Sequence, residues 1–468
     1  MMYSKYLSKK KDICKRLLDK LLLKYKYVSI LGKEIKGTSI RVSTFVTRIG
    51  DTFESQCGFV CRVYNNKSFS EYAFSDINDE NFDFIYEEII NKTKLSENLL
   101  NDQVKASIPE EEIIKQDFER KLDGKKLSNE TIINRFNTLK ERTHKYSDKI
   151  VNVIFGLEYY NVSSMFLSKN KELTQDFSWV LGIVNIVARD KENIKNVYNC
   201  YAHNSIEECL RDLSNNLKDL CETSIKLLDS TLIEPGVYDI ITTPAITGLI
   251  AHEAFGHGVE LDMFVKNRAK AKHYVNKYVA SPLITMHDGA SSCLSQASYF
   301  FDDDGVLAHD TVIIEKGVLK RGISDLVSAM QLKQEPTGNG RRQNPFHKSY
   351  SRMTNTFFEA GNDNVDDMIK SIKHGYMLCQ MDNGMEDPKN WNIQCTCAYA
   401  KEIIDGKFSG KIVAPVVMSG NVLDLLKSIT AVSKEFEIHG SGHCGKGHKE
   451  WVPVSDGGPY LKARCKLG

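Results

Sequence analysis

Three residues within six positions have the side chains needed for metal-assisted hydrolysis. His252, Glu253 and His257 form a His-Glu-x-x-x-His pattern inside TPAITGLIAHEAFGHGVELD, residues 243–262. Neutral imidazoles are good zinc ligands, and a carboxylate beside them can take the proton of an attacking water. The pattern therefore predicts two metal ligands and a general base at Glu253. Two histidines that merely pack in a protein core are the alternative that the spacing alone leaves open.

The five-residue spacing of the histidines needs a structural explanation. On a regular α-helix, His252 and His257 would point about 140° apart, too far to bind one ion easily. Pro244 and the apolar residues that follow it predict a helix leading into the motif. Either this helix ends near Gly256 and Gly258, or one i→i+5 π-turn brings the two rings together. We expect an irregularity between the two histidines in both cases.

Other polar residues are candidates for supporting roles. Glu260 follows His257 by three positions and is either a functional carboxylate, as an extra ligand or as a group that orients an imidazole, or a structural residue. Arg341 and Arg342 follow the glycine-containing stretch 338–340. A guanidinium on a mobile loop is suited to binding a peptide carboxylate or carbonyl, so we predict that these arginines bind substrate. The alternative is a basic pair that faces solvent.

Composition sets limits on the class of protein. The chain has 468 residues, 41% of them hydrophobic and 26% charged, with a net charge of +1. These values are typical of a globular protein, and they give no general attraction for nucleic acid or anionic membranes. No run approaches the roughly 18 to 20 apolar residues of a membrane span, and the basic N-terminus predicts an amphipathic helix rather than a signal peptide. We therefore expect a cytoplasmic protein with reduced cysteines.

The order of predicted elements indicates an α+β fold with two domains. Residues 1–105 are expected to form an N-terminal α/β domain, and the polar, acidic stretch 106–120 a linker. Residues 121–468 are expected to form a larger domain with an extensive antiparallel sheet and a metal-binding helix. Within it, residues 206–228 predict one long amphipathic helix that begins with a capping box.

Several separated stretches resemble one known family. They are HEAFGHGVELD at 252–262, FDDDG at 301–305, PTGNGRR at 336–342, RMTN at 352–355, CGKG at 444–447 and PVSDGGP at 453–459. In their order and gaps they are similar to the TldD/PmbA family of peptidases, which has also been called modulators of DNA gyrase. The resemblance covers nearly the whole chain and is weakest over the first hundred residues.

The resemblance implies an enzyme of the active TldD branch, because the PmbA (TldE) branch lacks the histidine motif. It implies zinc held by His252, His257 and Cys444, and hydrolysis of short or unfolded peptides in a cavity between two subunits. The partner would be a second copy or a PmbA/TldE-like chain. Iron is tolerated by the same ligands, although zinc suits them better. The sequence departs from the family pattern around Cys444, where His443 and His448 stand.

Three alternatives stay open at this stage. His443 is a candidate for substrate binding, while His439 and His448 are either functional or solvated loop residues. A non-catalytic assembly or regulatory subunit is the rival function, and the intact motif argues against it. A nucleic-acid-associated regulator, suggested by the older family name, has no basic stripe or aromatic platform to support it.

Overall fold

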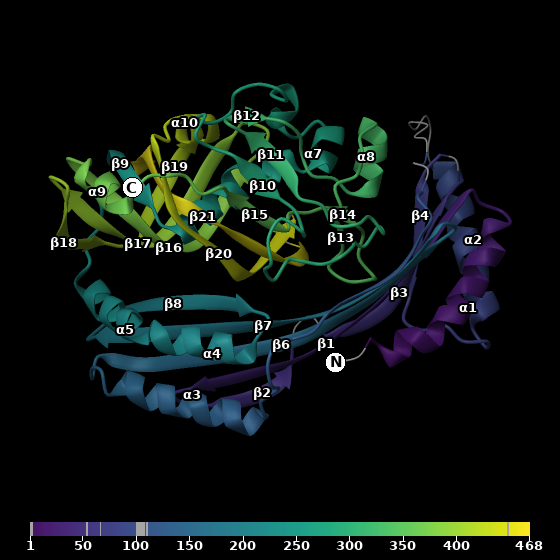
Figure 1. The fold of residues 1–468 in the computed structure, drawn as a ribbon, viewed down its shortest axis with the longest axis horizontal. Helices are drawn as coiled ribbons and strands as arrows, with labels where there is room; N and C mark the ends of the chain where they lie inside the picture. The colour runs from purple at the N-terminus through teal and green to yellow at the C-terminus, as the bar shows by residue number, and fades with distance from the viewer. Residues whose placement is uncertain (1–2, 53–54, 66, 100–107, 109–110, 447–448) are drawn as a thin grey trace.

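The computed structural model of the protein describes residues 3–52, 55–65, 67–99, 108, 111–446 and 449–468. Two large sheets organise these residues, one of eight strands and one of eleven, beside a two-stranded ribbon. Figure 1 shows the long strands of the first sheet running beneath the C-terminal half of the chain, with helices gathered near both of their ends. The fold is therefore mixed α+β, as the sequence predicted.

The eight-stranded sheet has the order β4-β3-β1-β6-β7-β5, with β2 paired to β1 and β8 paired to β7. Its pairs are antiparallel except β5 with β7. Its strands are β1 (Tyr27–Ser43), β2 (Thr47–Asp51), β3 (Gln56–Tyr64), β4 (Phe69–Phe74), β5 (Ile114–Arg120), β6 (Ile150–Ser168), β7 (Lys171–Asp190) and β8 (Asn193–His203). Strand β6 is continuous over its 19 residues and is one of the long strands that run beneath the C-terminal half of the chain (Figure 1).

Five α-helices accompany this sheet, and apolar side chains at helical spacing attach them to it. They are α1 (Lys5–Leu22), α2 (Phe82–Leu99), α3 (Asn129–His144), α4 (Ile206–Asn215) and α5 (Leu217–Lys226), followed by the short turn η1 (Leu227–Asp229). In α1, Cys14, Leu17, Leu18 and Leu21 are buried, as the amphipathic pattern predicted. The single helix predicted over 206–228 is instead broken at Asn216, whose backbone leaves the helical region between α4 and α5.

The expected boundary at 106–120 does not interrupt the sheet. Residues 114–120, assigned to the linker from their polarity, form β5 and pair in parallel with β7. This strand is polar because most of its residues are at least partly exposed at the sheet edge. Residues 100–107 and 109–110 of the expected linker lie outside the described part of the chain. The division into domains 1–105 and 121–468 stays a prediction about folding units.

The eleven-stranded sheet has the order β12-β11-β10-β15-β21-β19-β17-β16-β9, with β18 on β17 and β20 on β21. Its long strands are β9 (Gly236–Thr242), β16 (His374–Asp387), β17 (Asn392–Ile404), β18 (Lys407–Val413), β19 (Val416–Asn421), β20 (Ala431–Lys446) and β21 (Lys449–Leu467). The shorter ones are β10 (Met286–Asp288), β11 (Thr311–Glu315), β12 (Val318–Leu319) and β15 (Asn355–Phe358); β13 (Gly340–Arg341) and β14 (Tyr350–Ser351) form the ribbon. Most pairs are antiparallel, and β21 pairs with β9, β15, β19 and β20.

Short helical segments connect the strands of this half of the chain. They are α6 (Pro244–Leu249), η2 (Ile250–Gly256), η3 (His257–Val259), α7 (Leu261–Val265), η4 (Lys270–His273), α8 (Leu326–Leu332), α9 (Val365–Lys370) and α10 (Val422–Lys427). The segment from α6 to η3 is largely buried and contributes Ile246, Leu249, Ile250 and Phe255 to the largest hydrophobic core. Among the described residues, no helix is both long and apolar enough to cross a membrane.

Candidate functional site

The first histidine of the motif lies in a stretch of π-helix, and the second follows directly after it, at the start of η3. Strand β9 leads into α6, where Pro244 occupies the first turn, and η2 is a π-helix from Ile250 to Gly256. The backbone N–H of His257 donates to the carbonyl oxygen of His252, an i→i−5 bond between the two candidate ligands themselves. The imidazole rings are therefore neighbours, with centroids 5.2 Å apart. The predicted irregularity is confirmed, in its π-turn form.

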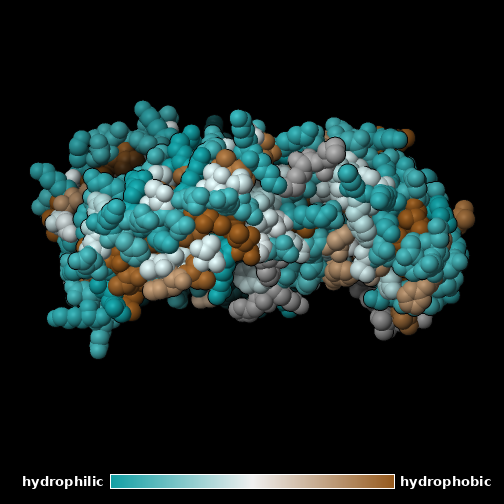
Figure 2. Space-filling view, turned by 90° about the horizontal axis from the view of Figure 1, so that it is seen from below, coloured by the Kyte–Doolittle hydropathy of each residue, from teal (hydrophilic) through white to brown (hydrophobic). Residues whose placement is uncertain are grey.

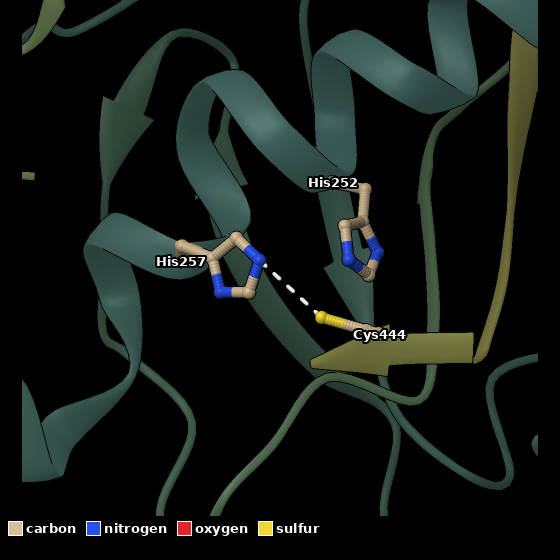
Figure 3. Close-up of side chains that lie close together, drawn as sticks. All are labelled: His252, His257 and Cys444. Atoms are coloured by element: carbon tan, nitrogen blue, oxygen red, sulfur yellow. Dashed lines mark hydrogen bonds between the residues drawn. The ribbon is translucent and has the colours of Figure 1, made fainter. Parts of the chain in front are cut away.

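Cys444 reaches these histidines from strand β20. Its Sγ lies 3.3 Å from Nε2 of His257. One donor atom each from His252, His257 and Cys444 lie within 4.8 Å of one another. Figure 3 shows the helical segment presenting both rings toward the sulfur, which the strand supplies from the opposite side. The structure thus brings together the three residues for which the sequence predicted a ligand role.

Electrostatics in this cluster favour the thiolate form of the cysteine. Burial alone would raise the pKa of the Cys444 thiol, but the facing imidazoles of His257 and His252 hold it well below its usual value. Burial likewise disfavours charge on the histidines, yet the Cys444 thiolate raises the pKa of His252 to about 9 and that of His257 well above its usual value. A thiolate is the form of cysteine that binds metals.

Glu253 lies at the edge of the donor cluster. Its Oε1 is 3.9 Å from Nε2 of His252, and its Oε2 is 3.8 Å from Nε2 of His257. Its side chain keeps 21% exposure, against 4% for His252. A carboxylate that borders the donors and still contacts solvent is placed to receive a proton from a water beside them.

Glu260 is buried under His257 and is held by two cations. Its Oε2 is 3.5 Å from Nδ1 of His257 and 2.9 Å from Nζ of Lys446, and Nε of Arg352 is 3.6 Å from Oε1. Arg352 also donates to the carbonyl oxygen of Cys444 at 2.6 Å. Of the two roles left open for Glu260, this geometry favours the one in which a carboxylate orients an imidazole. Arg352 and Lys446 link that carboxylate to the strand that carries Cys444.

Two buried carboxyl groups near the site were missed by sequence reasoning. Glu386 lies on β16 beside Gly258, and neither of its oxygens has a hydrogen bond of good geometry within the described residues. Burial, reinforced by nearby Glu253 and Glu260, raises the pKa of Glu386 well above its usual value. Burial also raises the pKa of Asp456, on β21, to about 6. Asp456 stands in the PVSDGGP motif, whereas no sequence signal marks Glu386.

The candidate substrate residues lie around a cavity of about 340 Å³ between the two sheets, whose lining includes Arg341, Arg342 and His443. Arg342 is placed differently from the expectation, because its guanidinium is held by Glu71 through contacts of 2.6 and 2.9 Å. The loop preceding both arginines is buried rather than mobile. Arg341 lines the cavity and has no ion pair within the described residues.

Of the other histidines near Cys444, His439 and His443 are not part of the donor cluster. His439 lies 3.6 Å from a carboxylate oxygen of Glu437, and burial lowers the pKa of its imidazole. His448 lies outside the described residues. His443 faces the cavity while Cys444, next to it on the same strand, faces the histidines of η2. This alternation follows from the two-residue period of a β-strand.

Comparison with known proteins agrees with a metal-dependent protease. Residues 235–464 match the PmbA/TldA metallopeptidase C-terminal domain. A metalloprotease of Methanocaldococcus jannaschii is 26% identical over 389 residues, covering 80% of this chain and 83% of that protein. A zinc metalloprotease TldD homolog of Saccharolobus solfataricus is 28% identical over 342 residues, covering 72% of this chain and 74% of that protein. The chain belongs to the PmbA/TldD metallopeptidase family.

Solved structures share the fold over nearly the whole chain. TldE from Thermococcus kodakarensis superposes with a TM-score of 0.75 at 18% identity, covering 97% of this chain and 100% of that one. A Thermotoga maritima protein described as a modulator of a DNA gyrase gives a TM-score of 0.75 at 17% identity, covering 98% of this chain and 100% of that one. At such low identity these structures establish the architecture alone.

Proposed function

We propose that this metalloprotease is a zinc-dependent peptidase of the TldD type that hydrolyses short or unfolded peptides within an enclosed cavity between subunits. The observation that carries the proposal is the convergence of the donor atoms of His252, His257 and Cys444 within 4.8 Å, with Glu253 beside them. A donor set of two imidazoles and one thiolate leaves one position of a tetrahedral zinc ion open. That composition fits zinc better than iron.

Each residue of the site has its own role in the proposed hydrolysis. A bound zinc ion would supply Lewis acidity that polarises the scissile carbonyl and makes a water acidic. Glu253 accepts the proton from the attacking water and delivers it to the departing amine. Glu260 orients His257 through Nδ1, and Arg352 holds the Cys444 strand in place. The π-turn of η2 aligns His252 and His257 on one side of the helical segment.

The ligand assignment is tested by substituting the cysteine. Purified Cys444→Ser protein is expected to contain far less zinc than the 1:1 stoichiometry expected of the wild type, because a serine hydroxyl is a poor substitute for a thiolate. Cys465→Ser removes another buried cysteine, outside the donor cluster, and should keep the metal. Inductively coupled plasma mass spectrometry on both variants measures this. Full zinc content in Cys444→Ser would remove Cys444 from the site.

The rival function is a non-catalytic subunit that uses this fold for assembly or regulation. The complete donor set and Glu253 favour the catalytic function. Digestion of an unfolded peptide by the zinc-loaded protein, with and without a chelator, separates the two. A metal-loaded protein that cleaves no peptide, alone or with a TldE-like partner, would favour the rival.

For assembly, we infer a dimer, either of two copies of this chain or with a PmbA/TldE-like chain. An interface that encloses the metal would spare folded proteins, which cannot thread in. The underside of the molecule is mainly hydrophilic with small apolar patches (Figure 2), and this exposed apolar surface is compatible with pairing. Mass measurement in solution, alone and after co-expression with a candidate partner, tests this. A stable monomer that also cuts folded proteins would contradict the enclosure.

A further inference from the structure

A cavity separate from the metal-ligand cluster lies between the eight-stranded sheet and the C-terminal half of the chain. Its volume is about 340 Å³, and we call it the Arg341 cavity. Apolar walls come from Ile35, Val162 and Phe177, which are paired neighbours on the eight-stranded sheet, and from Phe301 and Trp451 of the C-terminal half. A cavity of this size and character is suited to an amino-acid side chain or the end of a short peptide.

Arg341 brings a buried positive charge to this cavity without an ion-pair partner among the described residues. The residue is 8% exposed. Its Nη1 donates to the carbonyl oxygen of Met353 at 2.6 Å, and its guanidinium lies 5.6 Å from the ring centroid of Tyr299. Burial lowers the pKa of Arg341, which reflects the cost of this charge. A buried charge that lacks a partner is costly, so such groups usually meet one.

The other charged groups of the cavity wall are already engaged. Lys33 pairs with Asp303 at 2.9 Å, and Arg342 pairs with Glu71 at 2.6 Å. Asp302 accepts the backbone N–H of Gly340 at 2.8 Å, and burial raises the pKa of its carboxyl well above the usual value. Arg341 is thus the cation of this wall that has no ion pair within the described residues. Its charge is available to a ligand.

The position of the cavity relative to the candidate metal site suggests a role in peptide binding. His443 lines the cavity, and Cys444 faces the opposite side of the same strand, toward His257. A peptide that passes the β20–β21 hairpin could therefore present one part to Glu253 and another to Arg341. The planar guanidinium matches a carboxylate through two parallel hydrogen bonds, and the apolar walls match the body of the attached residue.

We propose that the Arg341 cavity binds a carboxylate of the peptide substrate and thereby anchors the chain relative to the metal site. This inference rests on the proposed peptidase function. The carboxylate has two sources in a peptide, the C-terminus and an acidic side chain, and both present the same group to Arg341. The consequence is a preference for peptides that carry a carboxylate at a fixed distance from the cleaved bond.

The zinc-loaded protein is tested with matched peptides that end in a free acid or an amide, each with Glu or Gln at internal positions. We expect kcat/KM to fall about tenfold or more when the recognised carboxylate is neutralised, since hydrogen bonds to charged groups are the strong ones. A fall in kcat/KM on amidation would identify the recognised carboxylate as the C-terminus. A fall on Glu-to-Gln exchange would identify it as the side chain. Equal kcat/KM for all four peptides would overturn the proposal.

The Arg341→Gln variant should raise KM for the preferred peptide, leave kcat nearly unchanged and remove the preference for the carboxylate. Arg341→Lys keeps the charge without the fork and should keep part of the preference. Lys36→Gln removes one positive charge from an exposed site on β1 and should change neither constant. An Arg341→Gln variant that keeps the wild-type preference would contradict the assignment, and so would one whose activity toward acid and amide peptides falls equally.

Calorimetry with N-acetyl-leucine and N-acetyl-leucinamide tests the cavity even if no peptide is cleaved. The acid should bind the wild-type protein more tightly than the amide, and Arg341→Gln should abolish the difference. Binding of the acid without hydrolysis would refute the proposed function and keep the anion site. Hydrolysis without a difference between the two ligands would keep the proposed function and refute the anion site.

Discussion

At the scale of single residues, adjacency in the chain decided what could be predicted. His252, Glu253 and His257 lie within six positions, so the sequence alone indicates their chemistry. Cys444 is 187 residues from His257, and only a family resemblance points to it. Glu386 could not be predicted, because strand packing alone brings it to Gly258. Arg342 was assigned to substrate, yet its carboxylate partner, Glu71, is distant in sequence.

Glu253→Gln tests the general base. The amide keeps the shape of the side chain but cannot accept the proton, so we expect kcat to fall by about 10² to 10⁴-fold with zinc retained. Peptide turnover and metal analysis on the same preparation measure both quantities. Glu234→Gln, at a residue outside the site, should be neutral. Near-normal turnover in Glu253→Gln would mean that another group takes the proton.

At the scale of elements, helix geometry predicted the irregularity in η2. Two rings five residues apart cannot share one side of a regular α-helix, and the π-turn resolves the conflict. The neighbouring strand β16 could not be assigned to the site from its sequence. Its Gly384 packs against Glu253 so closely that a Cβ atom there would lie 2.5 Å from Cγ of Glu253. The glycine therefore leaves the room that the Glu253 side chain occupies.

Gly384→Ala tests this contact. The added methyl group should push Glu253 away from the donor cluster, because 2.5 Å is far inside van der Waals contact. We expect lower kcat with zinc content preserved, since neither histidine is touched. Gly50→Ala on the exposed strand β2, where a Cβ meets no atom within 4 Å, is the matched control. Wild-type kcat in Gly384→Ala would show that Glu253 has freedom to adjust.

At the scale of the whole molecule, a buried charge network joins the eight-stranded sheet to loops of the C-terminal half of the chain. Glu71 on β4 pairs with Arg62 on β3 at 2.7 Å and with Arg342 from the C-terminal half at 2.6 Å. Arg62 also pairs with Asp304 of the FDDDG motif at 2.8 Å. The glycine-containing stretch before Arg342 suggested a mobile, exposed loop, whereas Arg342 is buried and its carboxylate partner is distant in sequence. Composition alone could not reveal this pairing.

The network predicts a specific pH dependence of stability. Burial would raise the pKa of Glu71, but the charges of Arg62 and Arg342 outweigh it and hold the pKa well below the usual range. A carboxyl group with a depressed pKa in the folded state stabilises the protein above its unfolded pKa of about 4.3, and this contribution is lost as the pH falls toward the folded pKa. Glu71→Gln leaves both arginines buried without that charge, which should cost about 3 to 5 kcal/mol near neutral pH.

The difference between wild type and Glu71→Gln should therefore shrink as the pH falls from about 7 to about 3, because below about 4.3 the unfolded wild-type chain takes up a proton at Glu71 whereas the folded protein does not. Urea unfolding of both proteins across this range measures the difference. Glu141→Gln, at an exposed position of α3, should leave stability unchanged at every pH. A Glu71→Gln penalty that is the same at both ends of the range would mean that folding does not depress the pKa of Glu71, and that packing rather than charge holds this side chain against Arg62 and Arg342.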